Sequence, residues 1–190
     1  MSPRTESQNE LIRQVKRKQI MDAALDLFAN VGYHPTSISE IAKRAGISKG
    51  LMYNYFDSKV DLLLSIVIEG YDRMIVSFDP NHDGVLTRDE MILFITDILD
   101  QIKTDPNYWK LYFSVMMQPT VNSIFHNELK DISAPFFEIL IRYFESAGKP
   151  NPEAETLLFH SMLDGICINY LYHANYPIKD IRQLIIERFI

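Results

Sequence analysis

Residues 36–59, TSISEIAKRAGISKGLMYNYFDSK, contain two short helical patterns on either side of a glycine. The first pattern places apolar side chains on one face of a helix, at Ile38, Ile41, Ala42 and Ala45. Gly46 can adopt the left-handed conformation that ends a helix, and Ser48 can cap a second helix over about residues 49–55. Two short helices joined by a turn of three or four residues are typical of a helix-turn-helix motif.

The sequence on both sides of this motif also predicts helices. Ser37 with Glu40 is a capping-box pattern, in which the side chain of each residue bonds the backbone N–H of the other. Ser58 with Asp61 repeats this pattern, and it opens a long helix to about residue 78. Upstream, apolar residues recur at helical spacing until Gly32, which ends the first helix of the chain.

Charge divides the chain into two parts that differ in sign. Residues 1–60 carry nine Lys and Arg against six Asp and Glu, a net charge of +3, whereas residues 61–190 carry ten against nineteen, a net charge of −9. Beyond residue 90, proline and glycine separate further helical patterns, and no strand alternation is sustained. We therefore predict an all-α fold with a basic N-terminal domain, residues 1–60, and an acidic helical domain, residues 61–190.

The helix-turn-helix stretch resembles the DNA-binding domain of the TetR family of bacterial regulators. The resemblance covers about residues 15–65, a third of the chain, and lies in the residues Phe28, Gly32, Tyr33, Thr36, Ile41, Ala42, Ala45, Gly46, Ile47, Ser48, Lys49, Gly50, Tyr53, Tyr55, Phe56, Ser58, Lys59, Leu62 and Leu63. It implies a TetR-like fold, an effector-binding C-terminal domain, and a homodimer that pairs through the last two helices. The implied function is a ligand-responsive regulator, most simply a repressor, that binds double-stranded DNA at a palindromic operator.

The resemblance also implies roles for individual side chains. The residues expected at DNA are Thr36, Ser37, Ser48, Lys49, Gly50, Leu51, Tyr53, Asn54, Tyr55 and Lys59. Lys49, Gly50 and Asn54 would face the bases, and the hydroxyl groups and Lys59 would hold phosphates. Leu51 departs from the family pattern, and it either touches a thymine methyl group or packs inward. Tyr53 and Phe56 have an alternative interpretation as core residues.

A second motif lies at residues 79–90, DPNHDGVLTRDE, and it matches the EF-hand calcium loop. The six predicted ligands are Asp79, Asn81, Asp83, the Val85 carbonyl, Thr87 and Glu90, because calcium takes six to eight oxygen atoms. The alternative is an ordinary turn followed by a Thr87–Glu90 capping box. If Ca²⁺ binds, it acts either as a fixed clasp between two helices or as a regulatory signal to the DNA-binding domain. A rival function is a calcium-binding helical sensor that does not act on DNA.

The C-terminal domain is rich in aromatic residues and methionine, which suits a pocket for a small, apolar effector of unknown identity. The predicted pocket residues are Trp109, Met116, Phe137 and His160. Helices over about residues 152–174 and 178–189 are the predicted dimer interface. No set of catalytic residues is recognisable, so we do not expect an enzyme. The single cysteine and the lack of a long apolar run are consistent with a cytoplasmic protein that does not bind membranes.

Overall fold

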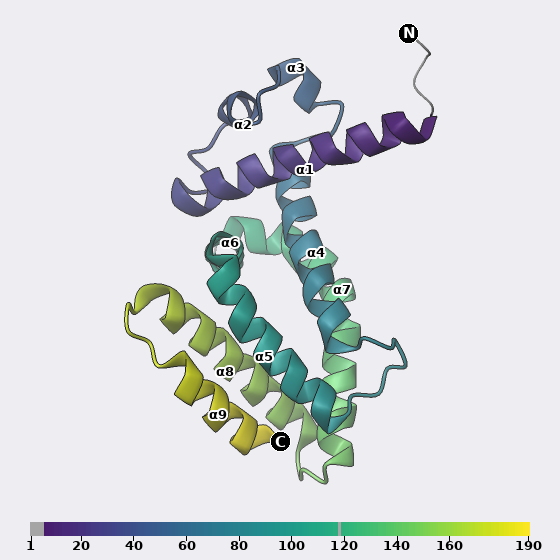
Figure 1. The fold of residues 1–190 in the computed structure, drawn as a ribbon, viewed down its shortest axis with the longest axis vertical. Coiled ribbons are helices and arrows are strands. Elements are labelled where there is room, and N and C mark those ends of the chain that lie inside the picture. The colour runs from purple at the N-terminus through teal and green to yellow at the C-terminus, as the bar shows by residue number, and fades with distance from the viewer. Residues whose placement is uncertain (1–5, 118) are drawn as a thin grey trace. The chain divides into compact units, whose positions relative to one another are not determined.

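The computed structural model describes residues 6–117 and 119–190, and the side chains of residues 7–117 and 130–190. Within these residues every regular element is a helix (Figure 1), which confirms the predicted all-α fold. The chain forms two compact units, Met1–Glu69 and Gly70–Ile190. The helix α4, Lys59–Phe78, contributes residues to both units, and the domain boundary predicted at residue 60 lies at its start.

The first unit contains α1 (Glu6–Asn30), α2 (Ile38–Arg44), α3 (Lys49–Met52) and the beginning of α4. The helix α2 packs against both α1 and α3. The largest buried side chains of this unit are Phe28, Ile20, Ile41, Met52, Leu62 and Leu63. The predicted first helix is confirmed, and it extends further toward the N-terminus. The second helix of the motif ends at Met52 rather than near residue 55, because residues 53–55 form a turn.

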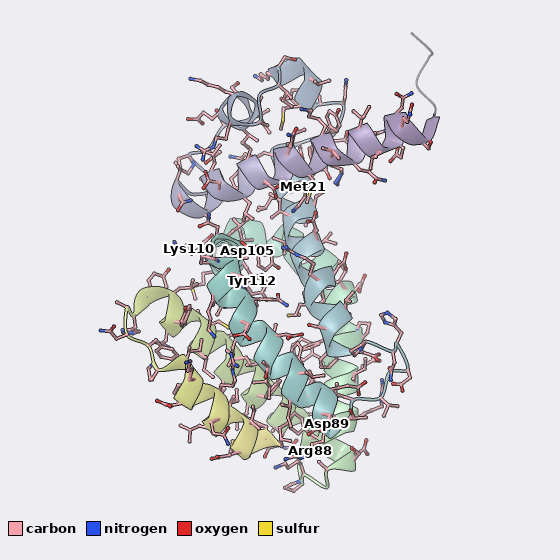
Figure 2. The ribbon with its side chains drawn as sticks, viewed as in Figure 1. Met21, Arg88, Asp89, Asp105, Lys110 and Tyr112 are labelled. Carbon is pink, nitrogen blue, oxygen red and sulfur yellow. The ribbon has the colours of Figure 1, made fainter. Side chains whose placement is uncertain are left out.

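The second unit contains the rest of α4 and five further helices: α5 (Arg88–Thr104), α6 (Pro106–Met116), α7 (Pro119–Ser146), α8 (Pro152–Tyr172) and α9 (Ile178–Phe189). Four of these helices, α6, α7, α8 and α9, begin at or directly after a proline, as their sequence predicts. Asp105, labelled in Figure 2, caps α6 by accepting the Tyr108 backbone N–H at 3.2 Å. The helix α7 packs against α8, α5 packs against α9, and α6 contacts α5, α7 and α8.

Phenylalanine side chains dominate the core of this unit. The fully buried ones are Phe78, Phe94, Phe144, Phe159 and Phe189. Burying one such ring stabilises the fold by about 2 kcal/mol relative to leaving it in water. Gly70 is required where α4 meets α6, because a Cβ atom at this position would overlap the ring of Tyr108. Among the described helices, none has the length and apolarity that crossing a bilayer requires.

Candidate functional site

The turn between α2 and α3 has the hydrogen bonds that its sequence predicts. Ser37 and Glu40 form the capping box, with the Glu40 carboxylate accepting the Ser37 backbone N–H at 2.7 Å. Gly46 has a φ of 65°, and the following Ile47 N–H donates to the Ala42 carbonyl at 3.0 Å. Ser48 then caps α3 by accepting the Leu51 N–H at 3.2 Å. The helix-turn-helix is therefore formed and closed at both ends by local bonds.

The segment made of α3 and the turn after it has one buried side and one side exposed to solvent. Met52 and Phe56 are buried against the domain core, whereas Tyr53 is 50% exposed. The exposed side also carries Lys49, Gly50, Leu51 and Asn54, and the cap residues Ser37 and Ser48 are exposed as well. Tyr55 is half-buried. Hence Phe56 is a core residue, Tyr53 is not, and Leu51 does not pack inward.

Two residues expected at DNA make contacts within the domain. Thr36 is buried, and its hydroxyl donates to the Gly32 carbonyl at 2.8 Å. The Lys59 ammonium donates to the carbonyls of Tyr33, His34 and Thr36 at 2.9, 3.2 and 2.9 Å. It also lies 4.4 Å from the centre of the Tyr33 ring, and burial lowers its pKa. These contacts fix the connection from α1 to α2, so both side chains position the motif.

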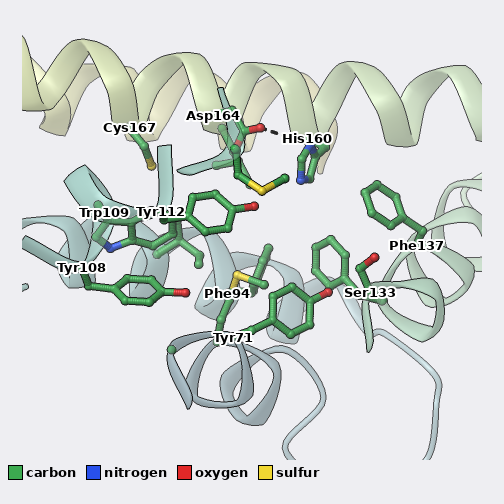
Figure 3. Close-up of a pocket in the computed structure, with 16 residues that line it drawn as sticks. Tyr71, Phe94, Tyr108, Trp109, Tyr112, Ser133, Phe137, His160, Asp164 and Cys167 are labelled. Carbon is green, nitrogen blue, oxygen red and sulfur yellow. Dashed lines mark ion pairs between the residues drawn. The ribbon is translucent and has the colours of Figure 1, made fainter. Parts of the chain in front are cut away.

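The second unit encloses a cavity of about 190 Å³. The four residues predicted for the pocket, Trp109, Met116, Phe137 and His160, all line it. Figure 3 shows Trp109 entering from one side of the cavity and Phe137 from the opposite side, with His160 above them on α8. The lining is otherwise mainly aromatic and aliphatic, which suits an apolar ligand.

Sequence reasoning missed several lining residues that contribute polar groups. Tyr71 on α4, Tyr112 on α6 and Asp164 on α8 all reach the cavity (Figure 3). The sequence contained a sign of two of them, because Tyr112 follows Tyr108 by one helical turn and Asp164 follows His160 by one turn. That spacing could not show that α4, α6 and α8 enclose a common space, which depends on tertiary packing.

The polar groups of the cavity are held in an apolar environment. The His160 Nδ1 atom lies 3.4 Å from an Asp164 carboxylate oxygen, and burial raises the pKa of that carboxyl. Burial also raises the pKa of the Cys167 thiol to about 12, so the thiol stays protonated and unreactive at neutral pH. The Tyr71 hydroxyl and the Trp109 indole N–H are buried and lack a hydrogen-bond partner among the described residues. The cavity can thus offer hydrogen bonds to a bound molecule.

The loop at residues 79–90 does not assemble the predicted metal site. The described residues contain no group of three or more His, Cys, Asp and Glu side chains placed to hold a metal ion. Instead, the carboxylates bond backbone N–H groups of the loop itself: Asp79 accepts from Gly84 at 3.0 Å and Asp83 accepts from Val85 at 2.8 Å. Glu90 forms the capping box with Thr87. Calcium binding therefore stays a prediction.

The last two helices leave apolar side chains in solvent. Leu157, Leu158 and Met162 on α8 are 61%, 43% and 36% exposed, and Leu184 on α9 is 59% exposed. Such a group of exposed aliphatic residues is typical of a surface that another protein chain covers. The two helices predicted to form the dimer interface are the ones that carry it.

Comparison with known proteins gives a family for the first unit. Residues 20–66 match the model of the bacterial regulatory proteins of the tetR family. The chain is 27% identical over 130 residues to IcaR of Staphylococcus epidermidis, a negative transcriptional regulator of the biofilm operon icaADBC, and this match covers 68% of the chain and 69% of IcaR. It is 32% identical over 93 residues to the fatty acid metabolism regulator protein of Bacillus subtilis, which covers 48% of each.

Solved structures extend the likeness to nearly the whole chain. The fatty acid degradation regulator FadR from Bacillus halodurans superposes with a TM-score of 0.76 at 18% identity, covering 92% of this chain and 94% of that one. FadR from Bacillus subtilis, solved with stearoyl-CoA, gives a TM-score of 0.72 at 21% identity, covering 91% and 97%. These relatives are regulators rather than enzymes, as the sequence predicted. Residues 20–66 therefore match the helix-turn-helix domain of the tetR family of bacterial regulatory proteins, and the described chain has a TetR-like fold.

Proposed function

We propose that this chain is a homodimeric, ligand-responsive repressor that binds a palindromic operator in the cytoplasm. The observation that carries the proposal is the exposed side of α3, where Lys49, Tyr53 and Asn54 face solvent beside Ser48. The neighbouring Met52 and Phe56 are buried in the domain core, which anchors the backbone that carries these polar groups. A short helix and following turn that present cationic, hydroxyl and amide groups on one side suit the major groove of DNA.

A two-fold dimer follows from the DNA target and from the surface of α8 and α9. A palindromic operator has two equivalent half-sites, and a dimer presents one motif to each of them. The exposed residues Leu158, Met162 and Leu184 supply an apolar surface for self-association. Gly165, one turn beyond Ser161 on α8, adds no side chain that would hold a partner helix away.

The cavity supports a small effector with an apolar body and a single polar or basic group. A cavity of about 150 Å³ holds a benzene molecule, so about 190 Å³ suits a ligand of roughly one to two rings. None of the described residues that line it is Lys or Arg, so an anionic group would lack a counter-charge there. A basic nitrogen beside Asp164 would compensate the buried carboxylate, and aromatic faces also attract cations.

Stearoyl-CoA, which was solved with FadR from Bacillus subtilis, differs from this expected effector in size and charge. The helix α4 offers a route from effector to DNA, because it starts directly after the motif and supplies Tyr71 and Met74 to the cavity. Effector binding that changes the position of α4 would lower the affinity for the operator.

Selection of binding sites from a library of random DNA duplexes tests the main proposal. We expect enrichment of an inverted repeat and an affinity that falls steeply with salt concentration. Tyr53→Ala should bind the selected duplex at least about tenfold more weakly, since it removes a contact on the exposed side of α3. Failure to enrich any sequence, with a protein that is folded by circular dichroism, would refute operator binding.

A further inference from the structure

The loop that joins α4 to α5 is not used by the proposed function. The calcium-loop motif, residues 79–90, covers this loop and the first three residues of α5, and its first carboxylate faces back into the loop, where Asp79 accepts the Gly84 backbone N–H at 3.0 Å. Gly84 has a φ of 71°, which favours glycine, and this bend brings the chain back toward Asp79. On the outer side, Arg142 of α7 donates to the Gly84 carbonyl at 3.1 Å.

The Asp79 carboxylate is buried without full compensation. The residue is only 7% exposed, and its second oxygen, Oδ1, is buried with no hydrogen-bond partner among the described residues. Arg142 bonds the Gly84 carbonyl, and no described Lys, Arg or His side chain forms an ion pair with Asp79. A buried carboxylate oxygen without a partner destabilises the fold unless a cation binds it.

Further oxygen atoms are available around this carboxylate in the same loop. Asn81 and Asp83 are exposed and bond only each other and the neighbouring backbone, at 2.8–3.1 Å. The Val85 carbonyl follows, and Val85 is 62% exposed. Glu90 is held by Thr87 in the capping box, so it must turn to become a ligand, which costs about 1 kcal/mol of capping energy. A flexible set made of oxygen atoms alone suits calcium better than a transition metal.

We propose that residues 79–90 bind one Ca²⁺ ion, which acts as a clasp between α4 and α5. Phe78, directly before the loop, packs edge-on against Phe94 of α5, with ring centres 4.8 Å apart. Both rings also contact Phe136 of α7, at 4.5 and 5.6 Å. The ion thus joins the end of α4 to the start of α5, next to the aromatic contact that already holds these two helix ends together.

The clasp has a consequence for the effector cavity. The helix α4 lines the cavity with Tyr71 and Met74, and α5 lines it with Phe94 and Ile98. An ion that fixes the angle between these helices also fixes one wall of the cavity. Calcium and effector are then expected to change each other's affinity by the same factor, because linkage between two binding sites is reciprocal.

Titration calorimetry of the full chain with CaCl₂, after removal of divalent ions with a chelator, tests the clasp directly. We expect one Ca²⁺ per chain, with a dissociation constant between about 1 µM and 1 mM for a single loop of this kind. Thermal unfolding should occur at a higher temperature in calcium than in chelator. Magnesium should bind more weakly, because its octahedral geometry does not suit the loop.

Three variants that each remove one negative charge distinguish calcium binding at the predicted ligands from a general attraction of calcium to acidic residues. Asp79→Asn and Glu90→Gln should each weaken calcium binding at least about tenfold, and glutamine keeps the capping box intact. Asp89→Asn, beside Arg88 at the start of α5 (Figure 2), removes the same charge from a position that is not a predicted ligand and should bind calcium normally. The proposal is overturned if the folded wild-type chain takes up no calcium at about 1 mM. It is also overturned if all three variants behave alike.

Discussion

Replacing Lys59 with methionine tests whether this lysine positions the DNA-binding motif or contacts DNA. Its ammonium donates to three backbone carbonyls of residues 33–36 and lies over the Tyr33 ring. Methionine keeps most of the apolar stem and removes the charge. Lys49→Met is the matched control, because Lys49 is an exposed lysine of the same motif, and no described side chain pairs with it.

The expected loss of stability follows from these contacts. A hydrogen bond to a charged group is worth about 1.5–3 kcal/mol net, and a cation–π contact about 0.5–1 kcal/mol. Since one partly exposed ammonium serves all three carbonyls, we expect Lys59→Met to cost about 2–3 kcal/mol in total. For a chain of this length that lowers Tm by about 4–12 °C. Lys49→Met should change the free energy of unfolding by less than about 0.5 kcal/mol.

Thermal unfolding and operator affinity at several salt concentrations distinguish the two lysines. Lys49→Met should melt like the wild type and lower the slope of log affinity against log salt by about one per bound motif. Lys59→Met should lower Tm and leave the salt slope unchanged once measured well below its Tm. If Lys59→Met melts like the wild type and lowers the salt slope as Lys49→Met does, Lys59 contacts phosphate and the positioning role is wrong.

Three further changes test the second unit. Gly70→Ala should destabilise the fold by about 1–3 kcal/mol in thermal unfolding, because its Cβ overlaps the Tyr108 ring; a normal Tm would contradict this close approach. Burial raises the pKa of the Asp164 carboxyl in the folded protein above its ordinary value in the unfolded chain. Between these two pKa values the native state binds more protons than the unfolded chain, so the free energy of unfolding falls as pH rises through this range. Asp164→Asn should remove this part of the fall in Tm, and an unchanged pH profile would argue against it. Leu158→Glu should yield monomers in sedimentation measurements if α8 forms the dimer interface, whereas an intact dimer would place the interface elsewhere.

The sequence was sufficient for the helical fold and for the DNA-binding motif, because both depend on local signals. Helix caps at Ser37, Ser48 and Thr87 are set by residues three positions away, and the structure has all three. Gly46 ends α2 through its own backbone conformation. Such interactions span at most one helical turn, so they can be recognised without knowing what the helices pack against.

Only the tertiary structure decided which motif residues face inward. Thr36 and Lys59 carry the polar groups expected of DNA contacts, yet one is buried and the other bonds carbonyls more than twenty residues away. The lining of the cavity was also only partly predictable from the sequence. Trp109 and His160 were predicted as pocket residues, but Tyr71 and Asp164 were not, because their meeting depends on how helices distant in sequence pack. The structure also shows that Asp79 is buried with its Oδ1 atom lacking a hydrogen-bond partner among the described residues, which the loop pattern alone could not show.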